Sequence, residues 1–152
     1  MTPTATIART DLRATPRLRA YTGFDMSFGR DSGSTAGAIA EADRAVPRRV
    51  RLIIRAALRY WGLSGLTESA ELLATELVTN AFKHGCGDVG VRLYLTASHL
   101  LIEVRDGSHE LPVPSNAALD DEDGRGLLLV ISIADNWGIS PDGTTTWCSL
   151  PF

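Results

Sequence analysis

The sequence predicts an α+β fold, in which helices and strands occupy separate stretches of one domain. Apolar residues recur at helical spacing over residues 46–61 and 70–83. They then alternate with polar residues over 89–104, as expected for a half-buried β-hairpin. The chain has 152 residues, of which 44% are hydrophobic. It is therefore long enough for one core and too short for two full domains.

The first 45 residues carry no strong helical pattern. Residues 1–19 are rich in Thr, Ala and Arg without apolar periodicity, so we expect a disordered N-terminal extension. Residues 20–28, AYTGFDMSF, predict an edge strand, and the Gly- and Ser-rich residues 29–37 predict a linker. We therefore divide the chain into the extension, an edge strand with linker at 20–45, and a folded domain at 46–152.

Two amphipathic helices open the folded domain. Pro47 suits the first turn of the first helix, and Gly62 suits its stop. Thr67 is expected to cap the second helix, over 70–83, and Gly85 lies just past its end. The positions that predict the buried face of the first helix are Val50, Ile53, Ile54, Ala57, Leu58 and Trp61.

The second half of the domain is predicted to contain a hairpin, a loop, a helix and a strand. The expected loop contains Pro112, Pro114 and an acidic run, and loops of this length in compact domains tend to be functional. In chain order the elements are strand 89–95, turn 96–99, strand 100–104, loop 107–124, helix 127–134 and strand 144–150.

Composition argues against several classes of protein. Cys86 and Cys148 are the only two cysteines and form no CxxC pair, so a zinc module or a disulfide-stapled secreted scaffold is not expected. No window approaches the roughly 18 apolar residues that span a bilayer. The N-terminal arginines are not followed by the apolar stretch of a signal peptide. We expect a cytoplasmic protein with no membrane partner.

The net charge of −3 hides an uneven distribution. Residues 1–60 contain eleven arginines and five acidic residues, whereas residues 61–152 contain four basic and thirteen acidic residues. These stretches are either two solvated faces of one domain or include a basic surface for an acidic protein partner. Few aromatic residues lie among the arginines, so direct binding of nucleic acid is not expected.

Four polar residues share one side of the second helix, at positions i, i+4, i+7 and i+8: Glu76, Asn80, Lys83 and His84. They border the apolar stripe that contains Leu77. Polar groups at the margin of a buried stripe need partners or a ligand. The alternative is an ordinary exposed helix face, on which Glu76 pairs with Lys83 or Asn80.

Two further features follow in the chain. Asp106-Gly107 places a carboxylate at a strand end, where ligands often bind in α/β sheets, although Asp-Gly is also a common turn. The segment 124–127, GRGL, then precedes a predicted helix. Glycines let the backbone approach an anion closely, and the free N–H groups of a helix N-terminus attract negative charge.

Four motifs occur in a specific order: ELVTNAFKHG at 76–85, VRDGS at 104–108, GRGLLLV at 124–130 and TTTWCSLP at 144–151. In this order the chain resembles the GHKL superfamily of ATP-binding domains (Bergerat fold) over roughly residues 46–152. It looks most similar to the small anti-sigma-factor serine/threonine kinases. The resemblance implies a two-layer α/β sandwich, with a mixed, mostly antiparallel sheet covered on one face by helices and a flexible ATP lid at 107–124.

The resemblance also implies ATP and Mg²⁺ as cofactors. Asn80 would hold Mg²⁺ through its amide oxygen. Asp106 would accept the exocyclic amine of adenine, supported by Thr145, and Glu76 would be the general base. The residues implied in nucleotide binding are Asn80, Lys83, His84, Asp106, Gly107, Gly124, Arg125, Gly126, Leu127 and Thr145.

The implied function is that of an anti-sigma factor with serine/threonine protein kinase activity. It would phosphorylate an anti-anti-sigma (STAS) partner, bind a sigma factor and so regulate transcription, as a homodimer. One departure is that the usual DxGxG motif reads DGSHE at 106–110. This departure favours the alternative, a non-catalytic nucleotide-binding or protein-interaction module of the same fold. A sensor histidine kinase is less favoured, since the chain is short for a preceding dimerisation helix with a phosphoacceptor histidine.

Overall fold

The computed structural model describes residues 22–31, 38–107 and 122–152. Two short 3₁₀ turns, Glu41–Asp43 and Ser64–Leu66, accompany the main elements. The helices and strands are β1 (Gly23–Phe28), α1 (Val46–Tyr60), α2 (Thr67–His84), β2 (Val89–Leu95), β3 (His99–Arg105), α3 (Glu122–Ile133), β4 (Asn136–Ile139) and β5 (Thr145–Pro151).

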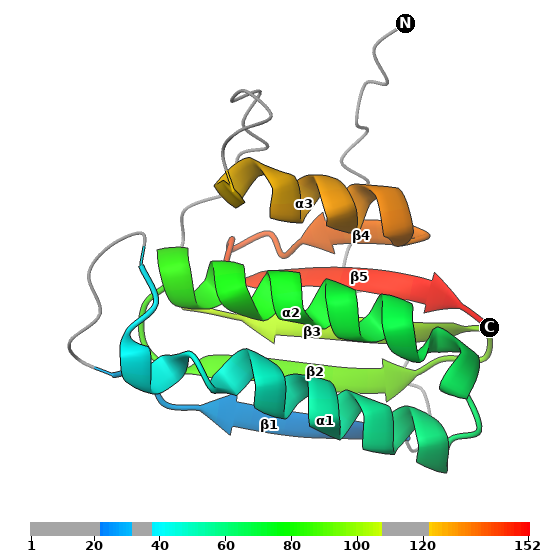
Figure 1. Ribbon diagram of the computed structural model, residues 1–152. Helices are drawn as coiled ribbons and strands as arrows, with labels where there is room; N and C mark the ends of the chain where they lie inside the picture. Colours follow the sequence, from blue (N-terminus) through cyan, green and yellow to red (C-terminus); the bar gives the residue numbers. More distant parts are fainter. Residues whose placement is uncertain (1–21, 32–37, 108–121) are drawn as a thin grey trace, which may run out of the picture.

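The structure confirms the α+β class and the two-layer sandwich. One sheet has the strand order β1-β2-β3-β5-β4, and all described neighbours are antiparallel, so no parallel pair of the expected mixed sheet occurs among them. Helices α1, α2 and α3 lie on the same face of this sheet (Figure 1). No helix in the part of the chain that the structure describes is long and apolar enough to cross a membrane.

Helix α1 buries one apolar stripe and exposes its arginines. Val50, Ile54 and Leu58 are fully buried, at the spacing that places residues on one helical face. The helix stops as predicted at Gly62, which has a left-handed φ of 72°. Glycine adopts this conformation without the steric cost that a side chain would add.

Helix α2 begins three residues earlier than predicted. Thr67 is its first helical residue, and no side-chain hydrogen bond caps this end, so the expected capping role of Thr67 is wrong. The 3₁₀ turn at Ser64–Leu66 leads directly into the helix. The chain is therefore already helical where an extended capping residue was expected.

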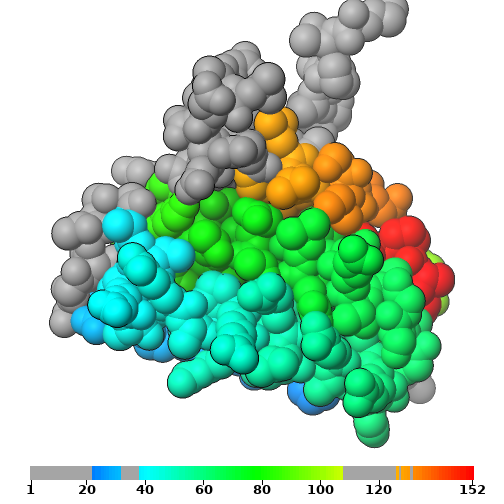
Figure 2. All heavy atoms as spheres, viewed as in Figure 1, coloured from blue at the N-terminus to red at the C-terminus, as the bar shows by residue number. Residues whose placement is uncertain are grey.

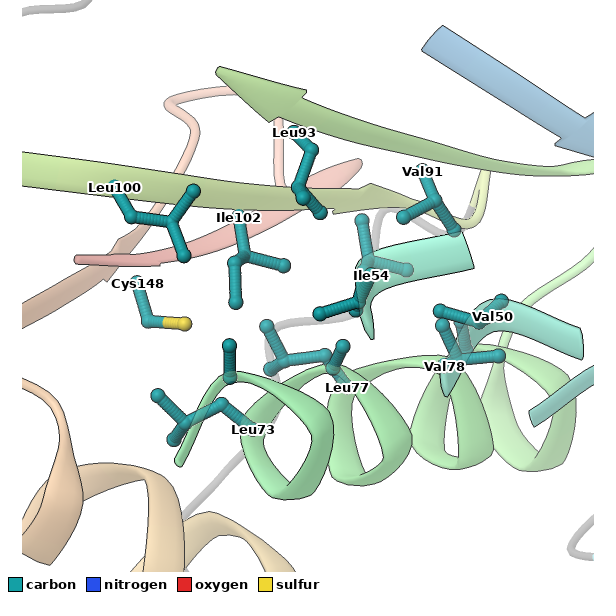
Figure 3. Close-up of a cluster of buried hydrophobic side chains, with 14 of the residues drawn as sticks. Val50, Ile54, Leu73, Leu77, Val78, Val91, Leu93, Leu100, Ile102 and Cys148 are labelled. Carbon is teal, nitrogen blue, oxygen red and sulfur yellow. The ribbon is translucent and has the colours of Figure 1, made fainter. Parts of the chain in front are cut away.

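The core lies between the sheet and the first two helices (Figure 3). The antiparallel register places Leu93 opposite Ile102, and Ile102 opposite Cys148. All three side chains are fully buried. Burial raises the pKa of the Cys148 thiol to about 12, so this cysteine is protonated at neutral pH and packs as an apolar side chain.

The C-terminal third differs from the prediction in two ways. Helix α3 begins at Glu122, five residues before the expected start at Leu127, and so takes in the end of the expected loop 107–124. The two glycines at 124 and 126 lower the helix propensity of this segment, so the sequence did not predict the first turns of α3 as helical. Strand β4 was missed because its four residues are too few to show an alternating pattern.

Some expectations concern residues outside the described part of the chain. The extension at 1–19 and residues 108–121 of the expected ATP lid belong to this group. Of the edge strand expected at 20–28, residues 22–28 are described, and Gly23–Phe28 form the edge strand β1. The expected linker at 29–37 is described only at 29–31, and there it is anchored: Arg30 bonds α2, and the N–H of Asp31 donates to the buried carboxylate of Asp43.

We expect Ile102→Ala to lower the free energy of unfolding by about 2–5 kcal/mol, because it leaves a cavity where β2, β3 and β5 meet the helices. Leu52→Ala is the matched control. Leu52 is 56% exposed on α1, and its truncation should change the free energy by no more than about 0.5 kcal/mol. Urea unfolding measures both values, and equal losses would contradict the central position of Ile102.

Candidate functional site

The polar side of α2 lies along its junction with α3. Glu76 and Asn80 are half-buried there, while Leu77 and Ala81 beside them are buried. Helix α3 runs alongside α2 in the ribbon and in the space-filling view (Figures 1 and 2). The two polar side chains are therefore placed between a packed core and a second helix, rather than on an open helix face.

Gly126 of α3 approaches this side of α2 closely. It is buried, and a Cβ built on it would overlap the Oε2 atom of Glu76 and lie 3.8 Å from the Nδ2 atom of Asn80. A stretch of backbone with no side chain thus lies directly against a carboxylate and a carboxamide. The structure brings together the predicted motifs at 76–85 and 124–130.

Asp106 lies at the C-terminal end of α2. Its N–H donates to the carbonyl of Thr144 at 3.0 Å, and its own carbonyl accepts the N–H of Cys86 at 2.9 Å. A Cβ at Gly85 would come within 2.6 Å of the Cβ of Asp106, so glycine makes room for the aspartate beside the helix. Gly107 then turns the chain with a φ of 71°. The backbone of Asp106 is therefore held by a helix end and by the residue before β5.

Three predicted motifs thus meet at α2. Glu76 and Asn80 contact α3, and Gly85 contacts Asp106. Glu76 and Gly85 are nine residues apart, which is about 14 Å along a helix axis. Helix α2 therefore has an acid, a carboxamide and a close glycine backbone part-way along its length, and a second acid at its C-terminal end.

The environment of Glu76 favours its protonated form. Partial burial raises the pKa of its carboxyl above the ordinary value, and the charge of Lys83 opposes this rise in part. A carboxylate with a raised pKa accepts a proton more readily, provided that it is ionised at the working pH. Lys83 is half-buried on the same helix, and His84 is exposed in the last turn.

The glycine-rich segment differs from the expected arrangement. Gly124, Arg125 and Leu127 lie within the first turns of α3, whereas the prediction placed them before a helix. In a helix that begins at Glu122, the N–H groups of residues 126 and 127 pair with carbonyls four residues earlier. Only the N–H groups of the very first turn are then free to bind an anion.

Thr145 is separated from the other predicted residues. Alternate residues of a strand face opposite sides, and Cys148 of the same strand is in the core, so Thr145 faces away from the helices. It lies opposite Arg105, and both residues line a hollow of about 480 Å³ with Arg92 and Glu103. Thr145 is thus on the other face of the sheet from α2.

Thr146 is the threonine of β5 that shares the helix-covered face, and sequence reasoning missed it. It lies opposite the buried Val104, two residues before Asp106 in β3. Three consecutive threonines show no alternation of apolar and polar residues. The motif alone therefore could not predict which of them faces the helices. The buried Cys148 and Leu150 provide the signal, because residues at even spacing from them face the same side.

Comparison with known proteins agrees with this geometry. A family model described as the histidine kinase-like ATPase domain matches residues 40–150, which include α1 through most of β5 and all three motifs that meet along α2. No curated protein matches the chain.

We expect Gly126→Ala to weaken ATP binding by about tenfold or more while leaving the fold intact, because the added methyl group pushes the Glu76 carboxylate against the carboxamide of Asn80, the expected Mg²⁺ ligand, which lies 3.8 Å from the same position. The free energy of unfolding should change by no more than about 1 kcal/mol, since alanine favours the helix and the displaced group is the end of a flexible side chain. Calorimetry and urea unfolding test the two claims.

Gly65→Ala is the control for this substitution. A Cβ at Gly65 meets nothing within 4 Å, so both quantities should remain at the wild-type values. Normal ATP affinity in Gly126→Ala would show that the close contact between α3 and α2 has no part in nucleotide binding.

We expect Glu76→Gln to raise the melting temperature at pH 8. Burial raises the Glu76 pKa in the folded chain, so the ionised carboxylate costs stability at any pH above that folded pKa. The gain should shrink as the pH falls and the folded carboxyl takes up its proton, and it should vanish below the ordinary value of 4.5. Thermal melts across this pH range test it. Glu68→Gln, an exposed change on the same helix, controls for loss of a charge, and equal behaviour of both variants would contradict the expectation.

Proposed function

Because this chain belongs to the histidine kinase-like ATPase domain family, we propose that it is a serine/threonine protein kinase that uses ATP and Mg²⁺. Its substrate would be an anti-anti-sigma protein of the STAS type. Its second partner would be a sigma factor, which it binds and so withholds from transcription. Support for this finer function comes from the order of the motifs at 76–85, 104–108 and 124–130.

The observation that carries the proposal is the close approach of Gly126 to the Glu76 carboxylate, with the carboxamide of Asn80 beside it. A kinase needs an acid near the reacting hydroxyl, a metal ligand near the phosphates, and a backbone that approaches phosphate oxygens closely. These three features come from two separate motifs and meet at one junction. If the polar side of α2 were an ordinary exposed surface, a glycine of a second helix would not be expected to lie against its carboxylate and carboxamide.

In this proposal Asp106 selects adenine. A carboxylate accepts hydrogen bonds only, so it suits the amino group of adenine and not the carbonyl at the same position of guanine. The backbone of Asp106 is bonded on both sides, to Thr144 and Cys86. Such preorganisation reduces the cost of binding, since the acceptor need not be ordered by the nucleotide.

Asn80 would hold Mg²⁺ through its amide oxygen. Mg²⁺ prefers oxygen ligands and keeps several waters, so one protein ligand together with phosphate oxygens is sufficient. Among residues 22–31, 38–107 and 122–152, no group of three or more His, Cys, Asp or Glu could hold a metal, so the proposed ion would take its other ligands from water and from the phosphates of the nucleotide. When bound, Mg²⁺ neutralises charge on the phosphates, and Lys83 would add to this.

Glu76 would act as the general base. It would accept the proton of the partner's serine hydroxyl while the hydroxyl oxygen bonds to the γ-phosphorus and ADP leaves as the bond to its β-phosphate oxygen breaks. The desolvation that raises its pKa also makes it a stronger proton acceptor. Gly126 covers one side of the carboxylate, which limits competing access by water.

The helical start of α3 supports a second candidate, a nucleotide-binding or protein-interaction module without phosphoryl transfer. With α3 helical from Glu122, the amides of residues 126 and 127 are paired within the helix. Phosphate binding through these amides then requires the first turns of α3 to open. A module that only docks a protein has no such requirement.

The remaining proposals concern partners, assembly and location. We place the partner surface on α1, where Arg48, Arg51 and Arg59 are exposed beside Tyr60, which is 83% exposed. Arginine and tyrosine are enriched at protein interfaces, and the positive charge suits an acidic partner. We also propose a homodimer in the cytoplasm.

Incubation of the chain with γ-labelled ATP, Mg²⁺ and purified STAS proteins tests the kinase proposal. We expect label on a serine of one STAS protein. Glu76→Ala should abolish transfer and keep ATP binding, because the base does not hold the nucleotide. Asn80→Ala should abolish Mg²⁺-dependent ATP binding, because the metal loses its protein ligand.

The outcomes separate the two candidates. ATP binding without transfer to any STAS protein supports the non-catalytic module. Unchanged Mg²⁺-dependent affinity in Asn80→Ala, measured by calorimetry, would contradict the assigned site whichever function holds. Glu71→Ala is the control, since Glu71 pairs with Arg55 elsewhere on α2 and should leave nucleotide binding and transfer intact.

A further inference from the structure

Arg30 joins the segment after β1 to the C-terminal turn of α2. Its Nη1 and Nη2 atoms donate to the carbonyls of Phe82 and Ala81 at 2.5 and 2.6 Å, and its Nε donates to the carbonyl of Gly87 at 3.0 Å. The guanidinium carbon also lies 5.3 Å from the centroid of the Phe82 ring. One side chain therefore contacts both the last turn of α2 and the loop that follows it.

The chemistry of this contact is specific to arginine. The carbonyl of Phe82 lacks an intrahelical partner, because the N–H of Cys86, four residues later, donates to the carbonyl of Asp106. The carbonyl of Ala81 accepts the N–H of Gly85 and takes Arg30 as a second donor. Both carbonyls lie at the end of the helix that carries partial negative charge, so a cation that donates to them is favourable. Two adjacent carbonyls match the planar fork of a guanidinium, which a lysine ammonium cannot reproduce. Phe82 is only 1% exposed, so the stacked ring beneath the guanidinium cannot shift without disturbing the core.

Arg30 is itself held from both sides. Phe28, two residues earlier, pairs with Val89 in β2. The N–H of Asp31, one residue later, donates to both carboxylate oxygens of Asp43, at 3.0 and 3.3 Å. Asp43 is only 5% exposed, so the backbone that carries Arg30 is fixed against the body of the domain.

The turn that Arg30 holds lies between the two halves of the proposed nucleotide site. Asn80 immediately precedes Ala81, and Gly85, which contacts Asp106, follows three residues after Phe82. A shift of this turn would change the distance between the metal ligand and the adenine acceptor. A small misplacement of binding groups is costly even where no contact to ligand is lost.

We infer that Arg30 is a positioning residue for the nucleotide site, setting the spacing of Asn80 and Asp106 through the C-terminal turn of α2. The inference rests on the proposed nucleotide-binding function. Arg30 lies outside residues 40–150, which match the family model. It therefore belongs to the part of the chain that this family model does not cover.

Arg55 provides a matched comparison. It also bridges to α2 from another element, with its Nε and Nη2 atoms donating to the carboxylate of Glu71 at 2.7 and 3.0 Å. Glu71 is nine residues before Asn80, about 14 Å along the helix. Loss of Arg55 therefore removes a comparable tether from α2 without touching the turn beside Asp106.

The test measures Mg²⁺-ATP and Mg²⁺-GTP affinities of the full chain by calorimetry, for wild type, Arg30→Gln, Arg30→Lys and Arg55→Gln. We expect Arg30→Gln to bind ATP about tenfold more weakly and to lose most of the preference for ATP over GTP, because Asp106 no longer sits at its proper distance. Arg30→Lys should not rescue the preference. Arg55→Gln should stay within about twofold of wild type in both affinities.

Thermal melts of the same four proteins show which variants fold, and affinities are compared at a temperature where all are folded. If Arg30→Gln does not fold, Arg30→Lys, which keeps the charge and loses the fork, carries the test. Wild-type ATP affinity and preference in a folded Arg30 variant would overturn the inference alone, as would equal losses in the Arg30 and Arg55 variants. A wild-type chain that binds no ATP would overturn the proposed function, and this inference with it.

Discussion

Everything in this domain depends on α2 having two different sides. One side supplies Leu73, Leu77 and Val78 to the core beneath the sheet. The other carries Glu76 and Asn80 at the junction with α3, where Gly126 lies against the Glu76 carboxylate. Because a helix is rigid over this length, packing of the apolar side determines where the polar groups lie. The site therefore takes its position from the core and not from loops.

Two glycines make close approaches to α2 possible, one part-way along the helix and one at its C-terminal end. Gly126 lets α3 lie against the carboxylate of Glu76, and Gly85 lets Asp106 lie against the end of α2. At both positions the lack of a side chain leaves the space that the neighbouring carboxyl group occupies. The cost appears in Glu76, whose charged form is disfavoured by the burial that this closeness produces. Burial that destabilises the charged form of a side chain is common at sites where that side chain reacts.

Periodicity predicted the parts of the fold that have long, regular patterns. The limits of α1, the β2–β3 hairpin and the stop at Gly62 could be read from spacing and from turn residues. The start of α3 could not, because Gly124 and Gly126 resemble a loop in sequence and become helical only against α2. The strand β4 could not be predicted either, because its four residues are recognised as a strand only from their pairing with β5.

The candidate site also has some features that the sequence predicted and others that it could not. The side of α2 shared by Glu76 and Asn80 follows from helical spacing alone, and the motif order pointed to Asp106 and Gly126. The Arg30 contact could not be predicted, because an arginine between an edge strand and a Gly-rich stretch has no pattern that names its carbonyl partners. Side-chain bonds across a long sequence separation depend on the folded topology.

The three threonines at 144–146 have one further consequence. They are chemically identical, so nothing in their own side chains decides which one faces the helices. A slip of β5 by one residue would exchange Thr145 and Thr146 between the two faces of the sheet. The same slip would carry Cys148 and Leu150 out of the core. The polar end of the strand is therefore kept in register by hydrophobic burial several residues away, and core substitutions in β5 would alter which threonine hydroxyl lies on the helix-covered face.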